Sequence, residues 1–188
     1  MKHGVIPSVL TLSFGKGDPK KDDINLVFLD EEGRLRDHFQ LDNLQDQEHK
    51  DEFLDFVKRR NPDVIAVGGF SIHTTKLVQD IKKLLQGDTQ AGADPSSSWG
   101  TEPTNEQSIK KPVIYVHDDV ARLFQHSKRA EEEFSALPMN AKYCVGLARY
   151  VQSPLNEFAA LGSDITAITF DEEAQHLVNM CIVHFQSY

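Results

Sequence analysis

The order of strand-like and helix-like segments predicts one α/β domain: a mixed five-stranded sheet, in the order 3-2-1-4-5, flanked by helices. Three short apolar runs come first, helical and strand patterns then alternate, and further helical patterns follow. At 188 residues the chain is long enough to bury a core without a second domain. A crossover after the third strand places the fourth strand beside the first and the fifth outside the fourth.

The first three strands are predicted at residues 7–15, 24–30 and 35–41. The second and third flank a short acidic turn, Glu-Glu-Gly-Arg, in which Gly33 tolerates a positive φ. This is a hairpin signal, so we expect an antiparallel meander.

The pattern then changes to a helical period. Residues 48–60 form an amphipathic pattern that Asn61-Pro62 ends. Residues 63–70 are nearly all apolar, which is typical of a central strand buried on both faces. Residues 74–86 form a second amphipathic helix, which Gly87 closes.

Residues 87–111 differ in kind, because they are rich in Gly, Ser, Thr, Pro and Asp and almost lack aliphatic side chains. This composition predicts a flexible surface insertion. We expect Trp99 within it to be exposed or loosely packed. The apolar pattern resumes at residues 112–119, a fifth strand whose end carries His117-Asp118-Asp119.

Two helical patterns follow this strand. The first is capped by Asp118 or Asp119, and the second, residues 140–152, places four side chains on one face: Cys144, Leu147, Ala148 and Val151. Ser153 and Pro154 restart a helix, as cap and first-turn proline, that ends near Gly162. Residues 164–170 are predicted to be extended, and residues 172–183 to be helical.

The formal charge of −9 and the isoelectric point near 5.3 narrow the function classes. An acidic chain repels phosphate at long range, which disfavours non-specific nucleic-acid binding and favours a basic partner such as a histone. The charge is equally consistent with solubility alone. No apolar run approaches the ~20 residues that a membrane-spanning helix needs. Cys144 and Cys181 stand in apolar surroundings, typical of buried reduced thiols, and no Cys or His pair has zinc-ligand spacing.

Three segments carry a family resemblance: residues 63–77, residues 116–127 and, most specifically, GLARYVQSPLNEFAAL at 146–161. They resemble the YqgF-type ribonuclease H-like domain of the eukaryotic transcription elongation factor and histone chaperone suppressor of Ty six, which is related to bacterial Tex. The similarity covers roughly residues 9–177. We therefore expect a YqgF-type domain at 1–178 and an atypical tail at 179–188, since NMCIVHFQSY does not resemble the family's continuation.

The resemblance implies a nuclear module inside a larger protein that supports elongation by RNA polymerase II and chaperones histones H3–H4. Direct partners would be neighbouring domains of the parent protein, with weak or no nucleic-acid binding by this domain alone, no membrane and no cofactor. A non-catalytic scaffold or interaction domain is the function we expect.

Active ribonuclease H-like nucleases hold two divalent metals with carboxylates on the first strand, the fourth strand and a following helix. Ser13 stands where those relatives have the aspartate of Asp-x-Gly, and the fourth strand ends in Gly68-Gly69 with no acid. Only Asp118 and Asp119 remain, and we interpret them as a helix N-terminus rather than a metal cluster. The resemblance therefore implies a degenerate site without metal: a pseudo-nuclease.

Other functions stay open at this point. One is a residual metal-dependent nuclease or a nucleic-acid-binding module that uses the basic runs 58–60 or 110–111. Another makes Ser13 a nucleophile with His73 as its base, but no motif places a general base. A third is a domain that only stabilises its neighbours in a larger chain.

Overall fold

The computed structural model describes residues 6–14, 23–69, 71–87 and 109–168. Its five strands form one mixed sheet in the order β3-β2-β1-β4-β5, with β2 antiparallel to β1 and β3, and with β1, β4 and β5 parallel. The strands are β1 (Val9–Ser13), β2 (Ile24–Leu29), β3 (Leu35–Leu41), β4 (Val64–Gly68) and β5 (Val113–Val116). The predicted fold class and strand order are confirmed.

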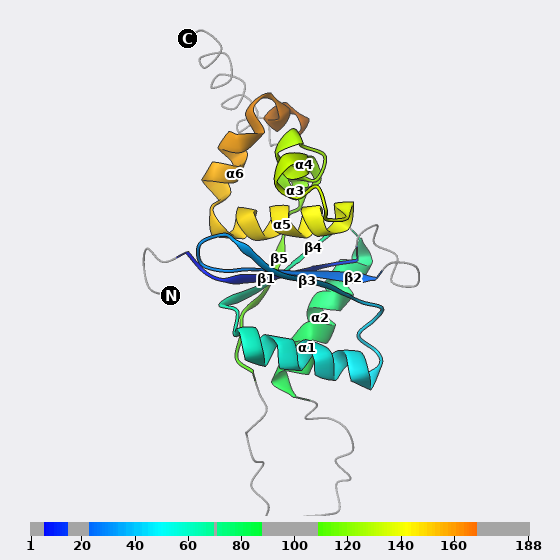
Figure 1. Cartoon of the computed structure of the whole chain (residues 1–188). Helices are drawn as coiled ribbons and strands as arrows, with labels where there is room; N and C mark the ends of the chain where they lie inside the picture. Colours follow the sequence, from blue (N-terminus) through cyan, green and yellow to red (C-terminus); the bar gives the residue numbers. More distant parts are fainter. Residues whose placement is uncertain (1–5, 15–22, 70, 88–108, 169–188) are drawn as a thin grey trace, which may run out of the picture.

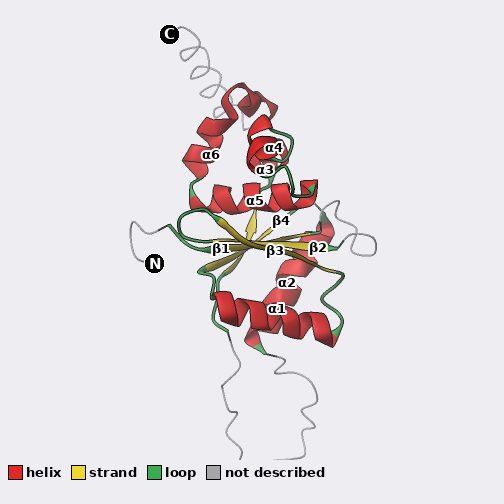
Figure 2. Ribbon diagram, in the orientation of Figure 1, coloured by secondary structure: helices red, strands yellow, loops and turns green. Residues whose placement is uncertain are grey.

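Helices cover both faces of the sheet (Figures 1 and 2). One face carries α1 (Gln47–Arg60) and α2 (Ile72–Gln86), and the other carries α5 (Met139–Gln152). Beyond α5 lie three short helices, α3 (Asp119–Phe124), α4 (Lys128–Glu133) and α6 (Pro154–Leu161). Each face has its own apolar cluster, so alternate residues of β1 enter different clusters: Leu10 and Leu12 one, Val9 the other.

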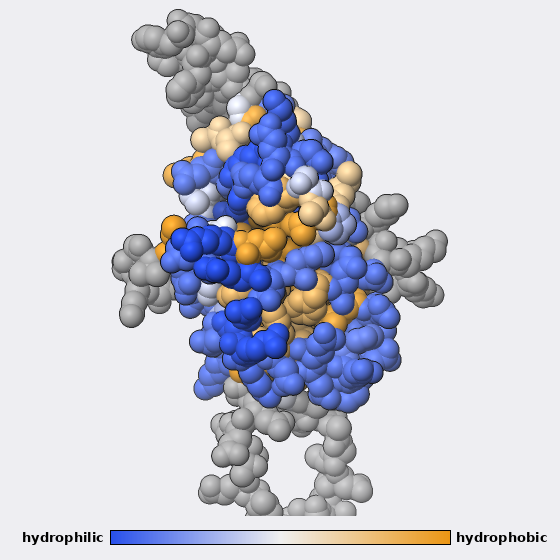
Figure 3. Space-filling view, viewed as in Figure 1, coloured by the Kyte–Doolittle hydropathy of each residue, from blue (hydrophilic) through white to orange (hydrophobic). Residues whose placement is uncertain are grey.

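The surface seen in Figure 3 is mostly hydrophilic, with apolar patches between charged regions. Within the described ranges, no helix is both long and apolar enough to cross a membrane.

The hairpin and helix ends follow the sequence signals. Gly33 has a φ of 74° and donates its N–H to the Asp30 carbonyl, while the Asp30 carboxylate accepts the N–H groups of Glu32 and Arg34. Asn61 ends α1 in the left-handed conformation, with φ 49° and ψ 50°. Both predicted interruptions therefore lie where the chain turns.

The extended segment predicted at 164–170 is wrong for its described part. Residues Gly162–Ala167 form a 3₁₀ helix, η1, and the Ile168 N–H bonds the Ile165 carbonyl. Isoleucines three positions apart share one side of a 3₁₀ helix, so the apolar spacing read as a strand is also satisfied by this tighter turn. Residues 169–170 lie outside the described residues.

Two capping predictions also need correction, and one helix was missed. Ser153 makes no side-chain cap bond: its backbone joins two helices, because its N–H ends α5 on the Arg149 carbonyl and its carbonyl accepts the Glu157 N–H of α6. Pro154 does occupy the first turn. The unpredicted helix is α4, a polar segment whose cap is Ser127, which accepts the Ala130 N–H.

Several predictions fall outside the described residues: most of the 87–111 insertion with Trp99, the 172–183 helix, the 179–188 tail and Cys181. Cys144 is described, and it is a fully buried free thiol. Burial raises its pKa, which keeps the thiol protonated and unreactive.

Candidate functional site

The carboxyl ends of β1, β4 and β5 meet at one edge of the sheet, because these three strands are parallel. In the register, Leu12 lies beside Val67 and Gly68 lies beside Val116. Ser13 therefore ends its strand next to Gly68, and His117-Asp118 leaves the sheet on the far side of the glycines. Ligand and catalytic sites of parallel sheets gather at this edge.

Ser13 and Asp118 are brought together by a residue that the sequence analysis did not single out, Tyr143 on α5. The Tyr143 hydroxyl donates to Asp118 Oδ2 at 2.9 Å, and the Ser13 hydroxyl bonds the same phenol. All three residues are buried, with exposed fractions of 1% for Ser13, 5% for Tyr143 and 6% for Asp118. Burial, followed by the Asp118 charge, raises the pKa of Tyr143 far above its ordinary value, so the phenol stays protonated and donates.

The structure explains why α5 lies so close to these strand ends. Thr11 on β1 donates its buried hydroxyl to the Cys144 carbonyl at 3.0 Å, and the Cys144 thiol contacts the Asn25 carbonyl on β2 at 3.6 Å. Small residues in the helix permit the approach, and a Cβ on Gly146 would lie 2.9 Å from the Phe124 ring. The polar side chains beneath α5 are thus partnered, as buried polar groups require.

Asp118 stands at the N-cap position of α3 but does not cap it. Its backbone, at φ −105° and ψ 5°, lies outside the extended region that N-cap residues adopt, and its side chain turns to Tyr143. The predicted helix N-terminus is therefore in the predicted place, whereas the predicted side-chain cap is wrong.

One arginine engages both aspartates. Arg122 Nε lies 3.6 Å from Asp118 Oδ1, and the Arg122 guanidinium also bonds Asp119 Oδ1. Its bond to Asp119 leads the interactions that raise the Arg122 pKa. The negative charge that a cation would need is already balanced by a cation of the protein itself.

The end of β4 has no room for a side chain. A Cβ added to Gly68 would lie 2.2 Å from Leu147 Cδ1, and Leu147 is fully buried. Gly69 has a φ of 143°, and a Cβ there would lie 2.6 Å from the Thr74 hydroxyl. Residues of α5 and α2 therefore fill the space in which a carboxylate of the fourth strand would stand.

The structure does not join His73 to Ser13. His73 is exposed on α2, Ser13 is buried beneath α5, and no hydrogen bond connects the two side chains in the described part of the chain. Across the described ranges, no three His, Cys, Asp or Glu side chains are placed to hold a metal ion. A hydroxyl, a phenol and a carboxylate balanced by arginine can support packing and docking, but they provide neither an activated nucleophile nor a metal cradle.

The sequence is similar to known proteins along most of its length. A family model described as YqgF, Holliday-junction resolvase-like of SPT6, matches residues 3–162. The transcription elongation factor SPT6 of Mycosarcoma maydis is 40% identical over 188 residues, which cover 88% of this chain and 11% of that protein.

Two further fungal relatives carry the same name. The spt6 protein of Schizosaccharomyces pombe is 41% identical over 94% of this chain and 11% of its own length, and the SPT6 of Gibberella zeae is 41% identical over 89% and 12%. The chain thus spans about a ninth of these relatives. Among solved structures, a fowlpox virus resolvase bound to Holliday junction DNA aligns with a TM-score of 0.40 and 13% identity, over 79% of this chain and 99% of that one.

Proposed function

Since the chain belongs to the YqgF family of Holliday-junction resolvase-like domains of SPT6, we propose that it is a non-catalytic scaffold domain of a transcription elongation factor. In this proposal the resolvase-like fold is kept as a rigid platform for neighbouring parts of a larger protein. The positions Ser13, Gly68, Gly69, Asp118 and Asp119 are then the remains of a metal site.

One observation carries the proposal: the closed hydrogen-bond cluster of Ser13, Tyr143 and Asp118. A two-metal nuclease needs unpaired carboxylates that draw cations out of water. Here the end of β1 supplies a neutral hydroxyl, and the remaining buried carboxylate is already bonded by a phenol and paired with Arg122. A divalent cation would have to displace both partners from Asp118 and would find no second acid in exchange at Ser13 or Gly68.

The relatives' names are the source of the wider role that we propose. A domain of a transcription elongation factor acts in the nucleus, with the RNA polymerase II elongation complex and with histones H3–H4 as partners of the parent protein. The net charge of −9 supports contact with basic histones rather than with nucleic acid. Binding of this kind weakens steeply with salt, because exposed charges are screened within ~10 Å at about 0.1 M ionic strength.

The test of the non-catalytic assignment is a nuclease assay of the full chain. Four-way junction, duplex and single-stranded DNA and RNA are incubated with Mn²⁺ or Mg²⁺, beside variants Asp118→Asn and Asp119→Asn. We expect no cleavage by any of the three proteins. Metal-dependent cleavage that Asp118→Asn abolishes would instead establish a residual nuclease.

Histone binding is measured separately. The chain is titrated with H3–H4 tetramer at low and at physiological salt, and we expect complex formation that weakens as salt rises. Absence of binding at low salt would remove histones as a direct partner of this domain while leaving the scaffold role intact.

A further inference from the structure

Helix α6 has an inverted pattern of burial. Of its eight residues only Asn156 and Glu157 are polar, yet Glu157 is the only one that is buried. Leu155 is 83% exposed, and Ala159, four positions later on the same face, is exposed as well. Apolar atoms mark the surface over α6 in Figure 3.

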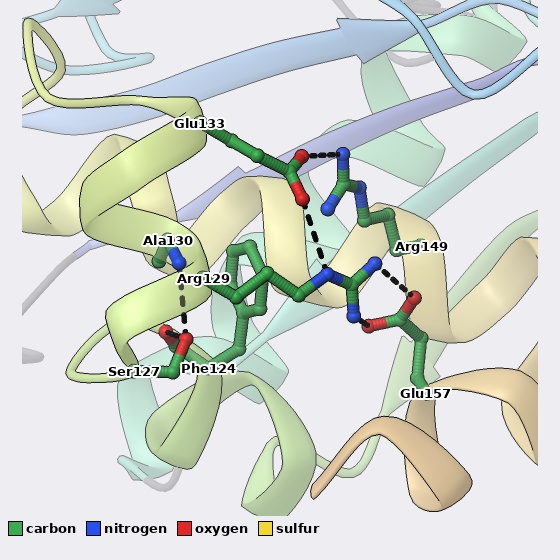
Figure 4. A network of polar contacts seen from close by, with 7 residues as sticks. All are labelled: Phe124, Ser127, Arg129, Ala130, Glu133, Arg149 and Glu157. Carbon is green, nitrogen blue, oxygen red and sulfur yellow. Dashed lines mark hydrogen bonds and ion pairs between the residues drawn. The ribbon is translucent and has the colours of Figure 1, made fainter.

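Glu157 fixes this orientation. Figure 4 shows Arg129 of α4 between two carboxylates: both its terminal nitrogens bond Glu157, each at 3.1 Å, and its Nε bonds Glu133 at 3.2 Å. The bidentate contact turns the charged side of α6 inward. The apolar side must then face outward, so its exposure follows from a specific contact inside the domain.

Single exposed apolar residues are common and need no explanation. A helical face is different, because an apolar stripe three and four residues apart is what a helix presents to another helix. Leu155, Phe158 and Ala159 form such a stripe, and Phe158 already packs edge-on against Tyr150 of α5. The two small alanines of α6 permit the close approach of a second helix.

The sequence that follows provides a matching face. Residues 171–185 lie outside the described residues, and their apolar side chains recur at the spacing of a helical stripe: Ala174, Leu177, Val178, Cys181, Ile182 and Phe185. Three acidic residues open the segment, at the end of a helix where negative charge is favoured. The last described residue, Ile168, is buried against the domain, so only residues 169–170 separate it from the segment.

We propose that residues 171–185 form an amphipathic helix that packs its apolar stripe against the Leu155–Ala159 face of α6. The connection from α6, residues 162–170, is about as long as the loops that join antiparallel helix neighbours. At 1.5 Å per residue the segment extends over about 22 Å and α6 over about 12 Å, so the new helix can cover the whole of α6. The domain then continues beyond the described residues into one more helix of the same layer.

Cys181 reports on this contact, because it lies in the proposed stripe while Cys144 is fully buried in the core. The full chain is treated with N-ethylmaleimide under native conditions, and labelling of each cysteine is followed by peptide mass. We expect Leu155→Glu to accelerate labelling of Cys181 by about tenfold or more, the range for removing one buried leucine from a contact. Ile72→Glu is the matched control, since Ile72 is also 83% exposed but lies on α2, and it should leave the Cys181 rate unchanged.

Slow labelling of Cys144 in Leu155→Glu shows that the domain has stayed folded, and Leu155→Ala supplies a milder second variant. Equal Cys181 rates in wild type, Leu155→Glu and Ile72→Glu would overturn the proposal. Protection of Cys181 that rises with protein concentration would overturn it as well, because the α6 face would then be covered by a second copy.

Discussion

Replacing Gly68 with alanine tests the close contact between β4 and α5 directly. Gly68 has an ordinary backbone conformation, so the substitution adds a steric effect without φ strain. The new Cβ would lie 2.2 Å and 2.7 Å from the two Leu147 methyl carbons, where carbon atoms prefer about 3.5–4.0 Å. Leu147 would have to move by more than an ångström in a fully buried position, which we expect to cost about 3 kcal/mol, the upper range for overpacking a core.

A double-mutant cycle isolates this contact. Leu147→Ala alone should cost about 3 kcal/mol through lost burial and a cavity. The double variant should lose about 4 kcal/mol rather than 6, because the alanine at 68 occupies space that the shortened side chain leaves, so the coupling is about 2 kcal/mol. Free energies of unfolding come from urea denaturation followed by circular dichroism.

The control cycle pairs Gly68→Ala with Leu85→Ala. Leu85 is equally buried but belongs to the cluster on the opposite face of the sheet, so its effect should add to that of Gly68→Ala. Full additivity in the Gly68/Leu147 cycle would show that Leu147 is not what fills the end of β4, and would remove that part of the case against a fourth-strand carboxylate.

Two further predictions concern the same lobe. The folded state keeps the Tyr143 phenol and the Cys144 thiol protonated while the unfolded chain releases both protons near the ordinary pKa values of 10.0 and 9.0, so stability should fall as pH rises above about 9, by about 1.4 kcal/mol per pH unit for each ionised group. Urea midpoints between pH 8 and pH 11 should therefore decline less steeply for Tyr143→Phe than for wild type, and equal slopes would contradict the buried, protonated phenol. Arg129→Met should cost about 3 kcal/mol in urea unfolding, the lower range for removing one partner of a buried pair, because Arg129 is 37% exposed whereas Glu157 is 8%. The double variant Arg129→Met with Glu157→Met should recover most of that loss, and a double variant as unstable as the single one would show that the ion pair is not what holds α6.

The sequence was sufficient for the sheet because its signals are local. Runs of apolar residues, Gly33 in the hairpin and Asn61 after α1 each determine the conformation of a few adjacent residues, and the chirality of crossovers limits the strand order. The 3₁₀ turn at Gly162–Ala167 was not predictable in this way, since the spacing of its isoleucines also fits a strand.

Tyr143 shows what the sequence could not provide. Its partner Asp118 lies 25 positions away, and the contact depends on how α5 rotates over the sheet. A signal was present nevertheless: residues 141–148 are buried without interruption, and a tyrosine in such a helix needs a partner for its hydroxyl. The pairing of Arg129 with Glu157 was missed for the same reason, because neither residue belongs to an apolar pattern.

The chemistry and the packing at this edge of the sheet depend on one another. An aspartate at Ser13 would set a second buried carboxylate beside Tyr143 and Asp118, and like charges at such a site cannot both ionise without a cation between them. An acid at Gly68 would first need a smaller residue than Leu147, which anchors α5 on the sheet. Arg122 would still occupy Asp118 and Asp119. A metal site at this edge therefore requires several coordinated changes, each destabilising before the cation can compensate for it, and this is why a single carboxylate restored here should lower stability without restoring metal binding.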